Sequence, residues 1–361
     1  MAKRPKLTDL MPEAGRDLLS SGGKEFVERI GVEAVRQVVH AVLCGENLRD
    51  STESLTRRRL ALSNGALLLL FLQGCRDVEN FVQTLPRLAE EEFQKTKKQE
   101  DRWILQWILG LTNKAVQNVL RDDPENLAKY RSEYEQTLNG TIQSCNDLFG
   151  TLSGNLEVST NLKANMDWRF IIQLLVAVGA QTLTLRGSDK SIYGKLFERL
   201  ILGCLLHALD FKFVDPDTNT DFNKVFWLSS RGERRESDAT AIYELGKGVR
   251  FDIGFIGRGN PEITLDKVSR FEREMEYGRS KHYMATFIIV DRVGPGSRII
   301  NLAEQIDGSV IQMSMTFWPQ DVARKLEEKL GMRHELANMP ISQIYAYLKT
   351  KVQGAPIEGF I

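Results

Sequence analysis

The spacing of the apolar residues changes once along the chain, and this change limits the possible folds more than any other feature. Before residue 165 apolar side chains recur at intervals of three and four, as in residues 26–42 and 103–111, which predicts amphipathic helices. Residues 150–165 are rich in Gly, Asn, Ser and Thr, and strand-like runs follow them. The length of 361 residues allows two domains. We therefore expect an α-helical N-terminal domain at 1–165 and a mixed α/β domain at 166–361.

The second half combines helices and strands in a defined order. Helices are predicted at 168–185 and 193–209, and strands at 224–229, 239–244, 249–256 and 262–268. The glycines of Gly246-Lys247-Gly248 favour a hairpin turn between two of these strands. A charged helix at 269–281 precedes an apolar strand at 284–290, whose lack of alternation indicates burial on both faces. A helix at 299–306, an alternating strand at 310–317 and two short helices complete the prediction.

Composition excludes several classes of protein. The net charge is zero, with 48 Lys and Arg against 48 Asp and Glu, so the chain does not coat nucleic acid through bulk positive charge. The longest apolar run, residues 66–72, is too short to cross a bilayer, and the N-terminus lacks a secretory signal. Four dispersed cysteines form no CxxC pair, so neither a disulfide framework nor a zinc site is expected. We expect a cytoplasmic protein with no membrane contact.

An acidic residue interrupts the strand predicted at 249–256. Phe251, Ile253 and Phe255 point to one face, which leaves Arg250 and Asp252 on the other. Asp is disfavoured in a strand, so a buried partner or a metal ion must account for it.

A second acid follows a tight turn. Glu262 opens the next strand after residues 257–261, and two adjacent antiparallel strands bring Asp252 and Glu262 to one site. Paired carboxylates suit Mg²⁺, which prefers oxygen ligands. The glycines of the turn do not form a dinucleotide loop, because Glu262 takes the place of the last glycine in GxGxxG and no helix follows.

The charged segment at 231–238 is the best candidate for contact with DNA bases. Its members Arg234, Arg235, Glu236 and Asp238 combine two residue types that read C·G pairs, because Arg bonds to guanine and a carboxylate accepts from cytosine. A solvated loop with internal salt bridges is the alternative, and Asp238 is equally suited to be a third metal-site acid or a turn cap. Residues 57–59 are three consecutive arginines, for which we expect a solvated helix face rather than phosphate contact.

These patterns together resemble a known family. An acid in one strand is followed by a short turn and by Glu-x-(Lys or a substitute) in the next strand. This order, after a helix that carries Glu198 and before a helix and a buried strand, resembles the PD-(D/E)XK nuclease core. The segments YGKLFERL at 193–200, ESDAT at 236–240 and FDIGF at 251–255 are most similar to the CfrBI type of type II restriction endonucleases. The resemblance covers residues 190–290.

The resemblance implies an activity and a partner. It implies an α/β (α+β) nuclease core that cuts double-stranded DNA with Mg²⁺ at a palindromic site, which for this family is CCWWGG, cut after the first C. A palindrome implies a homodimer, with one active site for each strand.

The resemblance also implies roles for individual residues. Asp252 and Glu262 match the metal-binding acids, and Glu198 matches the acid on the preceding helix. The usual motif lysine is replaced by Thr264. Lys267 would supply the cation if the strand bulges or ends there, and Lys195 or Arg250 is the alternative.

Two other functions remain open at this point. One is a metal-dependent nuclease of repair or defence without a palindromic target. The other is a non-enzymatic DNA-binding protein, in which Asp252 and Glu262 form a structural ion-pair network with Arg250 or Lys267.

Overall fold

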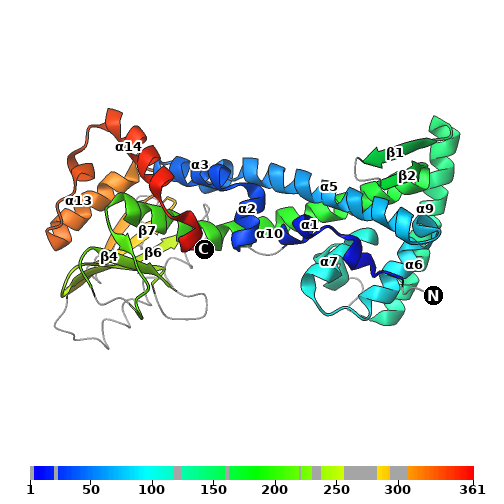
Figure 1. Ribbon diagram of the computed structural model, residues 1–361, viewed down its shortest axis with the longest axis horizontal. Helices are drawn as coiled ribbons and strands as arrows, with labels where there is room; N and C mark the ends of the chain where they lie inside the picture. Colours follow the sequence, from blue (N-terminus) through cyan, green and yellow to red (C-terminus); the bar gives the residue numbers. More distant parts are fainter. Residues whose placement is uncertain are drawn as a thin grey trace. The chain divides into compact units, whose positions relative to one another are not determined.

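The computed structural model describes residues 4–19, 23–117, 123–158, 162–218, 221–229, 237–255, 283–292 and 308–361 (Figure 1). The described chain is mixed α/β with a helical N-terminal region, which confirms the predicted fold class. It divides into two compact units, one formed by Met1–Arg29 with Thr56–Lys190 and the other by Ile30–Leu55 with Ser191–Ile361.

The first unit is built almost entirely from helices. Its helices, in chain order, are η1 (Leu7–Leu10), α1 (Glu13–Asp17), α2 (Lys24–Ile30), α5 (Glu53–Asp77), α6 (Phe81–Phe93), α7 (Gln99–Ile108), α8 (Asn113–Ala115), α9 (Pro124–Phe149) and the first part of α10 (Trp168–Ala208). Within this unit α5 and α10 run side by side (Figure 1). Phe71 of α5 lies between Phe81 and Phe170, with ring centroids 6.0 and 5.7 Å away. This aromatic contact joins three helices in one core.

Two paired strands lie largely within the Gly-, Asn-, Ser- and Thr-rich stretch in which the domain boundary is expected. Strands β1 (Gly154–Val158) and β2 (Leu162–Met166) pair antiparallel, with Leu156 opposite Ala164. Leu162 and Ala164 face the helical core and are buried. Strand β2 therefore contributes to the core of the first unit, because its alternate residues bury apolar side chains there.

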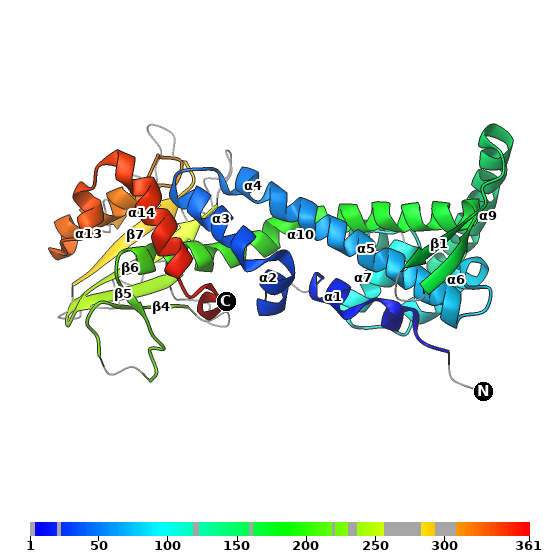
Figure 2. The same ribbon diagram turned by 45° about the horizontal axis from the view of Figure 1, so that its top comes forward.

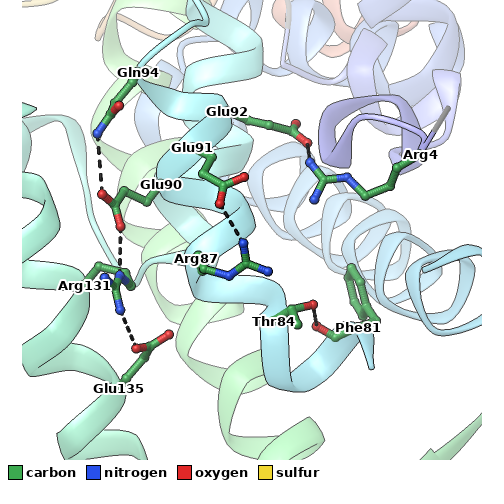
Figure 3. Close-up of polar contacts among 10 residues, drawn as sticks. All are labelled: Arg4, Phe81, Thr84, Arg87, Glu90, Glu91, Glu92, Gln94, Arg131 and Glu135. Atoms are coloured by element: carbon green, nitrogen blue, oxygen red, sulfur yellow. Dashed lines mark hydrogen bonds and ion pairs between the residues drawn. The ribbon is translucent and has the colours of Figure 1, made fainter. Parts of the chain in front are cut away.

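Polar contacts tie α6 to its neighbours (Figure 3). The carboxylate of Glu90 accepts a hydrogen bond from Arg131 of α9 at 2.8 Å, and Arg131 also bonds Glu135 at 2.6 Å. On another side of α6, Glu92 accepts from the backbone N–H of Leu7 at 2.9 Å and from Arg4 at 3.1 Å. These contacts hold both α9 and the N-terminal segment against α6.

The expectation that residues 57–59 form a solvated helix face is wrong for one of the three arginines. Arg57 and Arg58 are exposed, but Arg59 is fully buried. Its Nε and Nη2 donate to the carbonyl of Leu18 at 3.0 and 2.7 Å, and its guanidinium lies 5.2 Å from the ring centroid of Phe26. Burial of this charge is compensated by hydrogen bonds and by the aromatic ring.

The second unit is centred on a mixed sheet of six strands among the described residues (Figure 2). They are β3 (Lys212–Phe213), β4 (Val225–Leu228), β5 (Ala239–Glu244), β6 (Lys247–Gly254), β7 (Tyr283–Val290) and β8 (Gly308–Gln312), in that spatial order. The pairs β4·β5 and β5·β6 are antiparallel, and β6·β7 and β7·β8 are parallel. The strands predicted at 224–229, 239–244, 249–256 and 284–290 are confirmed within two residues at each end.

Other predictions for this unit are corrected or lie outside the described residues. The strand expected at 310–317 ends at Gln312, because a turn follows and Phe317 adopts φ 55° before α13 begins. The two helices expected at 168–185 and 193–209 are one continuous helix, α10. The strand at 262–268 and the helices at 269–281 and 299–306 lie outside the described residues.

Further helices pack around the sheet. They are α3 (Val32–Leu43), α4 (Leu48–Ser51), α13 (Trp318–Leu330), η3 (Glu335–Asn338), α14 (Ile341–Gly354) and η4 (Ile357–Phe360). Helix α3 lies alongside α14 (Figure 2), and Arg36 Nη2 donates to the carbonyl of Ala355 at 2.9 Å. Phe360 contacts Phe213 and Phe226, with centroids 5.2 and 6.0 Å apart. The C-terminus is therefore part of the core beside β4.

Candidate active site

Asp252 lies near the end of β6, and its carboxylate is almost completely buried. Only 3% of the residue is exposed. Its neighbours Phe251 and Ile253 are fully buried and point to the opposite face of the sheet, as alternation requires. On β7 the residue paired with Asp252 is Ile288. The structure thus places an acidic side chain in the interior of the sheet, as the sequence predicted.

A row of polar residues crosses the same face of the sheet two residues before Asp252, at the level of Arg250 on β6. Arg250 of β6 pairs with Thr240 on β5 and with Thr286 on β7. Thr286 is buried and Arg250 is half-buried. Thr286 was not predicted from the sequence, although a hydroxyl among the apolar residues of this strand was a visible signal.

Asp238 is joined directly to the segment that carries Asp252. Its Oδ2 accepts a hydrogen bond from the backbone N–H of Ile253 at 2.8 Å. The backbone pairing of β5 with β6 begins at Ala239, opposite Phe251. The Asp238 side chain therefore adds one more hydrogen bond between the two strands, just beyond the last backbone pair. The contact fixes the position of β6 next to Asp252.

Arg199, the neighbour of Glu198 on α10, bonds to the end of β4. Arg199 donates from Nε to the carbonyl of Phe360 at 2.8 Å and from Nη1 to the carbonyl of Ser229, at the end of β4. The backbone N–H of Ser229 in turn donates to the carbonyl of Asp238 at 3.2 Å. A continuous set of hydrogen bonds therefore connects the Glu198 turn of α10, the end of β4, Asp238 and the Asp252 segment.

A further acid, which the sequence analysis missed, follows β7. Gly254 of β6 pairs with Val290 of β7, so Asp291 stands at the edge of the sheet where β6 ends. Its Oδ2 accepts from Asn47 Nδ2 at 3.2 Å. Burial raises the pKa of Asp291, the charge of Asp50 raises it further, and Arg292 opposes both.

The remaining candidate residues lie outside the described residues. They are Glu262, Thr264 and Lys267 of the predicted catalytic set, and Arg234, Arg235 and Glu236 of the predicted DNA-recognition segment. Of the two alternative cations, Lys195 is exposed on α10 one turn before Glu198, and Arg250 lies in the polar row beside Asp252.

The donor set suits a hard divalent cation. Among the described residues no three His, Cys, Asp or Glu side chains are grouped so that they could hold a metal ion. Asp252 is nevertheless a buried carboxylate near the end of a strand, and a carboxylate is an oxygen donor of the kind that hard cations prefer. A site completed by Glu262 would present oxygen ligands alone, as Mg²⁺ requires.

Comparison with known proteins identifies the family. The family model described as CfrBI restriction endonuclease matches residues 32–298. The chain is also 36% identical over 355 residues to the type II restriction enzyme CfrBI of Citrobacter freundii, and the match covers 93% of each chain. The chain belongs to the CfrBI restriction endonuclease family. No solved structure matches it.

Membership of the CfrBI family decides between the functions left open by the sequence. A type II restriction endonuclease is a site-specific deoxyribonuclease of a restriction-modification system and acts on double-stranded DNA, and such enzymes generally use a divalent metal ion. The family match spans both units of the fold. The polar set around Asp252 is therefore the candidate active site of a CfrBI-family nuclease.

Proposed function

We propose that this chain is a Mg²⁺-dependent, homodimeric, cytoplasmic restriction endonuclease that cuts both strands of a palindromic DNA site. The target CCWWGG, cut after the first C, comes from the family resemblance. The observation that carries the proposal is the hydrogen-bonded connection between the turn of Glu198, Asp238 and the segment of Asp252. It joins Asp238 to the segment of Asp252 at one end of the β4–β5–β6 sheet and ties the helix that carries Glu198 to the end of β4, which supports the proposed site.

The proposed reaction is hydrolysis of a phosphodiester bond without a covalent intermediate. Asp252 and Glu262 would hold Mg²⁺, which supplies an activated water and stabilises the charge that develops on the phosphate oxygens. The buried position of Asp252 keeps its carboxylate in a fixed orientation. Glu198 is the acid contributed by α10. Because Thr264 replaces the usual lysine, we assign the cationic role to Lys267, Lys195 or Arg250.

We propose different roles for two parts of the segment first considered for DNA recognition. Arg234, Arg235 and Glu236 remain the candidates that contact bases, because their side-chain types match the groups exposed by C·G pairs. Asp238 instead positions β6, since its carboxylate accepts the backbone N–H of Ile253. We place the catalytic machinery in the domain 166–361 and leave 1–165 as the helical N-terminal domain.

Digestion of a sequenced plasmid tests the target and the metal requirement. The plasmid carries one unmodified CCWWGG site, and the fragment ends are sequenced after incubation with Mg²⁺ or with EDTA. We expect a single Mg²⁺-dependent cut after the first C on each strand. A matched plasmid with one outer C·G pair replaced should stay intact. Discrete cuts at another sequence would refute the target, and random ends would refute the site-specific function.

A further inference from the structure

Ser229, the residue that follows β4, is hydrogen-bonded through each of its three polar groups. Its backbone N–H donates to the carbonyl of Asp238 at 3.2 Å, and its hydroxyl donates to the carbonyl of Ser237. Its own carbonyl accepts from Nη1 of Arg199. Ser229 and Ser237 are the described residues on either side of the segment 230–236. The two ends of this segment are therefore bonded to each other.

The segment 230–236 carries the residues that we propose to contact DNA bases, namely Arg234, Arg235 and Glu236. Hydrogen bonds to base edges discriminate between base pairs through their direction and length. Side chains that read bases must therefore be carried by a backbone that is held in place. The bonds made by Ser229 fix the points at which this segment leaves the sheet and returns to it.

Arg199 attaches these points to the rest of the second unit. It is half-buried on α10, and while Nη1 bonds Ser229, Nε donates to the carbonyl of Phe360 at 2.8 Å. The ring of Phe360 is fully buried against Phe213 and Phe226, so its carbonyl stands in a packed part of the core. A guanidinium group is planar and presents its donors in fixed directions. Arg199 therefore ties the position of Ser229 to the core.

We propose that Arg199 is a positioning residue for sequence recognition. It holds Ser229, and with it both ends of the segment 230–236, in the position that reading of the outer base pairs requires. It acts through Ser229 and not by contact with DNA. The inference rests on the proposed restriction function and adds to it the residue on which discrimination between target and non-target DNA depends.

Cleavage of two DNA duplexes tests this role. One carries the sequence that the wild type cuts in the plasmid digestion, and the other has one outer base pair of that sequence replaced. We expect Arg199→Met to lower the ratio of the two single-turnover rates at least about 10-fold, since one bidentate base contact supplies discrimination of this order. Arg199→Lys keeps a donor for one of the two carbonyls and should retain a larger ratio. Ser229→Ala should lower the ratio in the same direction.

Arg36 provides the matched control. It is also half-buried in the second unit, and it also donates to two backbone carbonyls, those of Val352 and Ala355. These bonds hold α3 against the end of α14 and do not involve β4. We expect Arg36→Met to lower the melting temperature as Arg199→Met does, but to leave the ratio of cleavage rates unchanged. The control thus separates a loss of stability from a loss of discrimination.

Hydrogen exchange of the DNA-free protein measures the hydrogen bonds themselves. We expect the backbone N–H of Ser229 to exchange at least about 10-fold faster in Arg199→Met than in the wild type, and at the wild-type rate in Arg36→Met. This measurement requires neither Mg²⁺ nor a known target.

The other outcomes refute the inference in distinguishable ways. Faster exchange with an unchanged rate ratio makes Arg199 a structural residue without a role in recognition. An equal fall in both rates makes it a residue that positions the catalytic groups instead. If Arg199→Met does not fold, an unchanged ratio in both Arg199→Lys and Ser229→Ala refutes the role. A wild type that cuts no DNA refutes the restriction function itself, while the exchange rate still decides whether Arg199 holds Ser229.

Discussion

Asp238 provides a quantitative test of how the site is held together. Asp238→Ala removes the acceptor for the N–H of Ile253, a residue with no exposed surface. A buried donor left without this acceptor costs about 1–3 kcal/mol of unfolding free energy. The end of β6 is then free to shift, and a displacement of about 1 Å at a reacting group lowers the rate on the order of 100-fold. We therefore expect loss of both stability and catalytic rate.

The amide variant separates positioning from a charge-dependent role. Asp238→Asn keeps an oxygen that accepts the same N–H, so we expect it to retain most of the stability and cleavage rate. Urea unfolding measures the stability, and single-turnover cleavage over a range of Mg²⁺ concentrations measures the rate. Glu244→Gln, at the exposed end of the same hairpin where Glu244 bonds Lys247 at 2.6 Å, is the matched control. If Asp238→Asn is as inactive as Asp238→Ala while both remain fully stable, Asp238 acts through its charge and the positioning role is refuted.

Three further predictions concern the packing around the site and in the first unit. Gly203→Ala should lower the unfolding free energy by about 1–3 kcal/mol, because its Cβ would lie 2.5 Å from the ring of Phe360. In Gly194→Ala, on the same helix, the Cβ meets no atom within 4 Å, so this control should be neutral or stabilising. If urea unfolding gives the same change in free energy for both variants, the packing of Gly203 against Phe360 is contradicted. Arg59→Leu should cost about 2–4 kcal/mol through the unpaired carbonyl of Leu18, whereas Arg58→Leu at an exposed position should cost little by the same assay. Burial lowers the pKa of His334 despite the opposing charge of Asp210, and its neutral Nδ1 accepts from Leu336 N at 3.2 Å. The unfolding free energy should therefore fall as the pH decreases from about 6.5 through the folded-state pKa of His334. A His334→Asn variant whose melting temperature depends on pH in the same way as the wild type would contradict this prediction.

The strands were predictable because their signals are local. Phe251 and Ile253 alternate with Asp252, and Gly246 supplies the turn with φ 85°, so both the hairpin and the face of Asp252 follow from residues close in sequence. The metal-binding role proposed for Asp252 comes from the family resemblance and from its expected pairing with Glu262, since no periodicity reveals it.

Other features depend on contacts between distant residues. The sequence predicted a break in the helix between residues 185 and 193. The helix is continuous because Leu185 and Tyr193 are both buried, and their packing outweighs the cost of about 1 kcal/mol for placing Gly187 in a helix. The role of Asp238 depends on the register of β5 against β6, which the sequence does not contain. The burial of Arg59 had a signal, since it lies on the stripe of Leu55, Ser63 and Leu67, all of them buried.

The most direct test of the central claim is the cleavage rate of Asp252→Asn on target DNA with Mg²⁺, measured together with DNA binding and thermal unfolding. Because we place Asp252 in the metal site, we expect the rate to fall at least about 1,000-fold while the folded protein still binds its target. Glu244→Gln should cut at the wild-type rate. A well-folded Asp252→Asn enzyme that cuts at the wild-type rate would contradict the account, as would a variant that fails to fold, which would make Asp252 a structural residue.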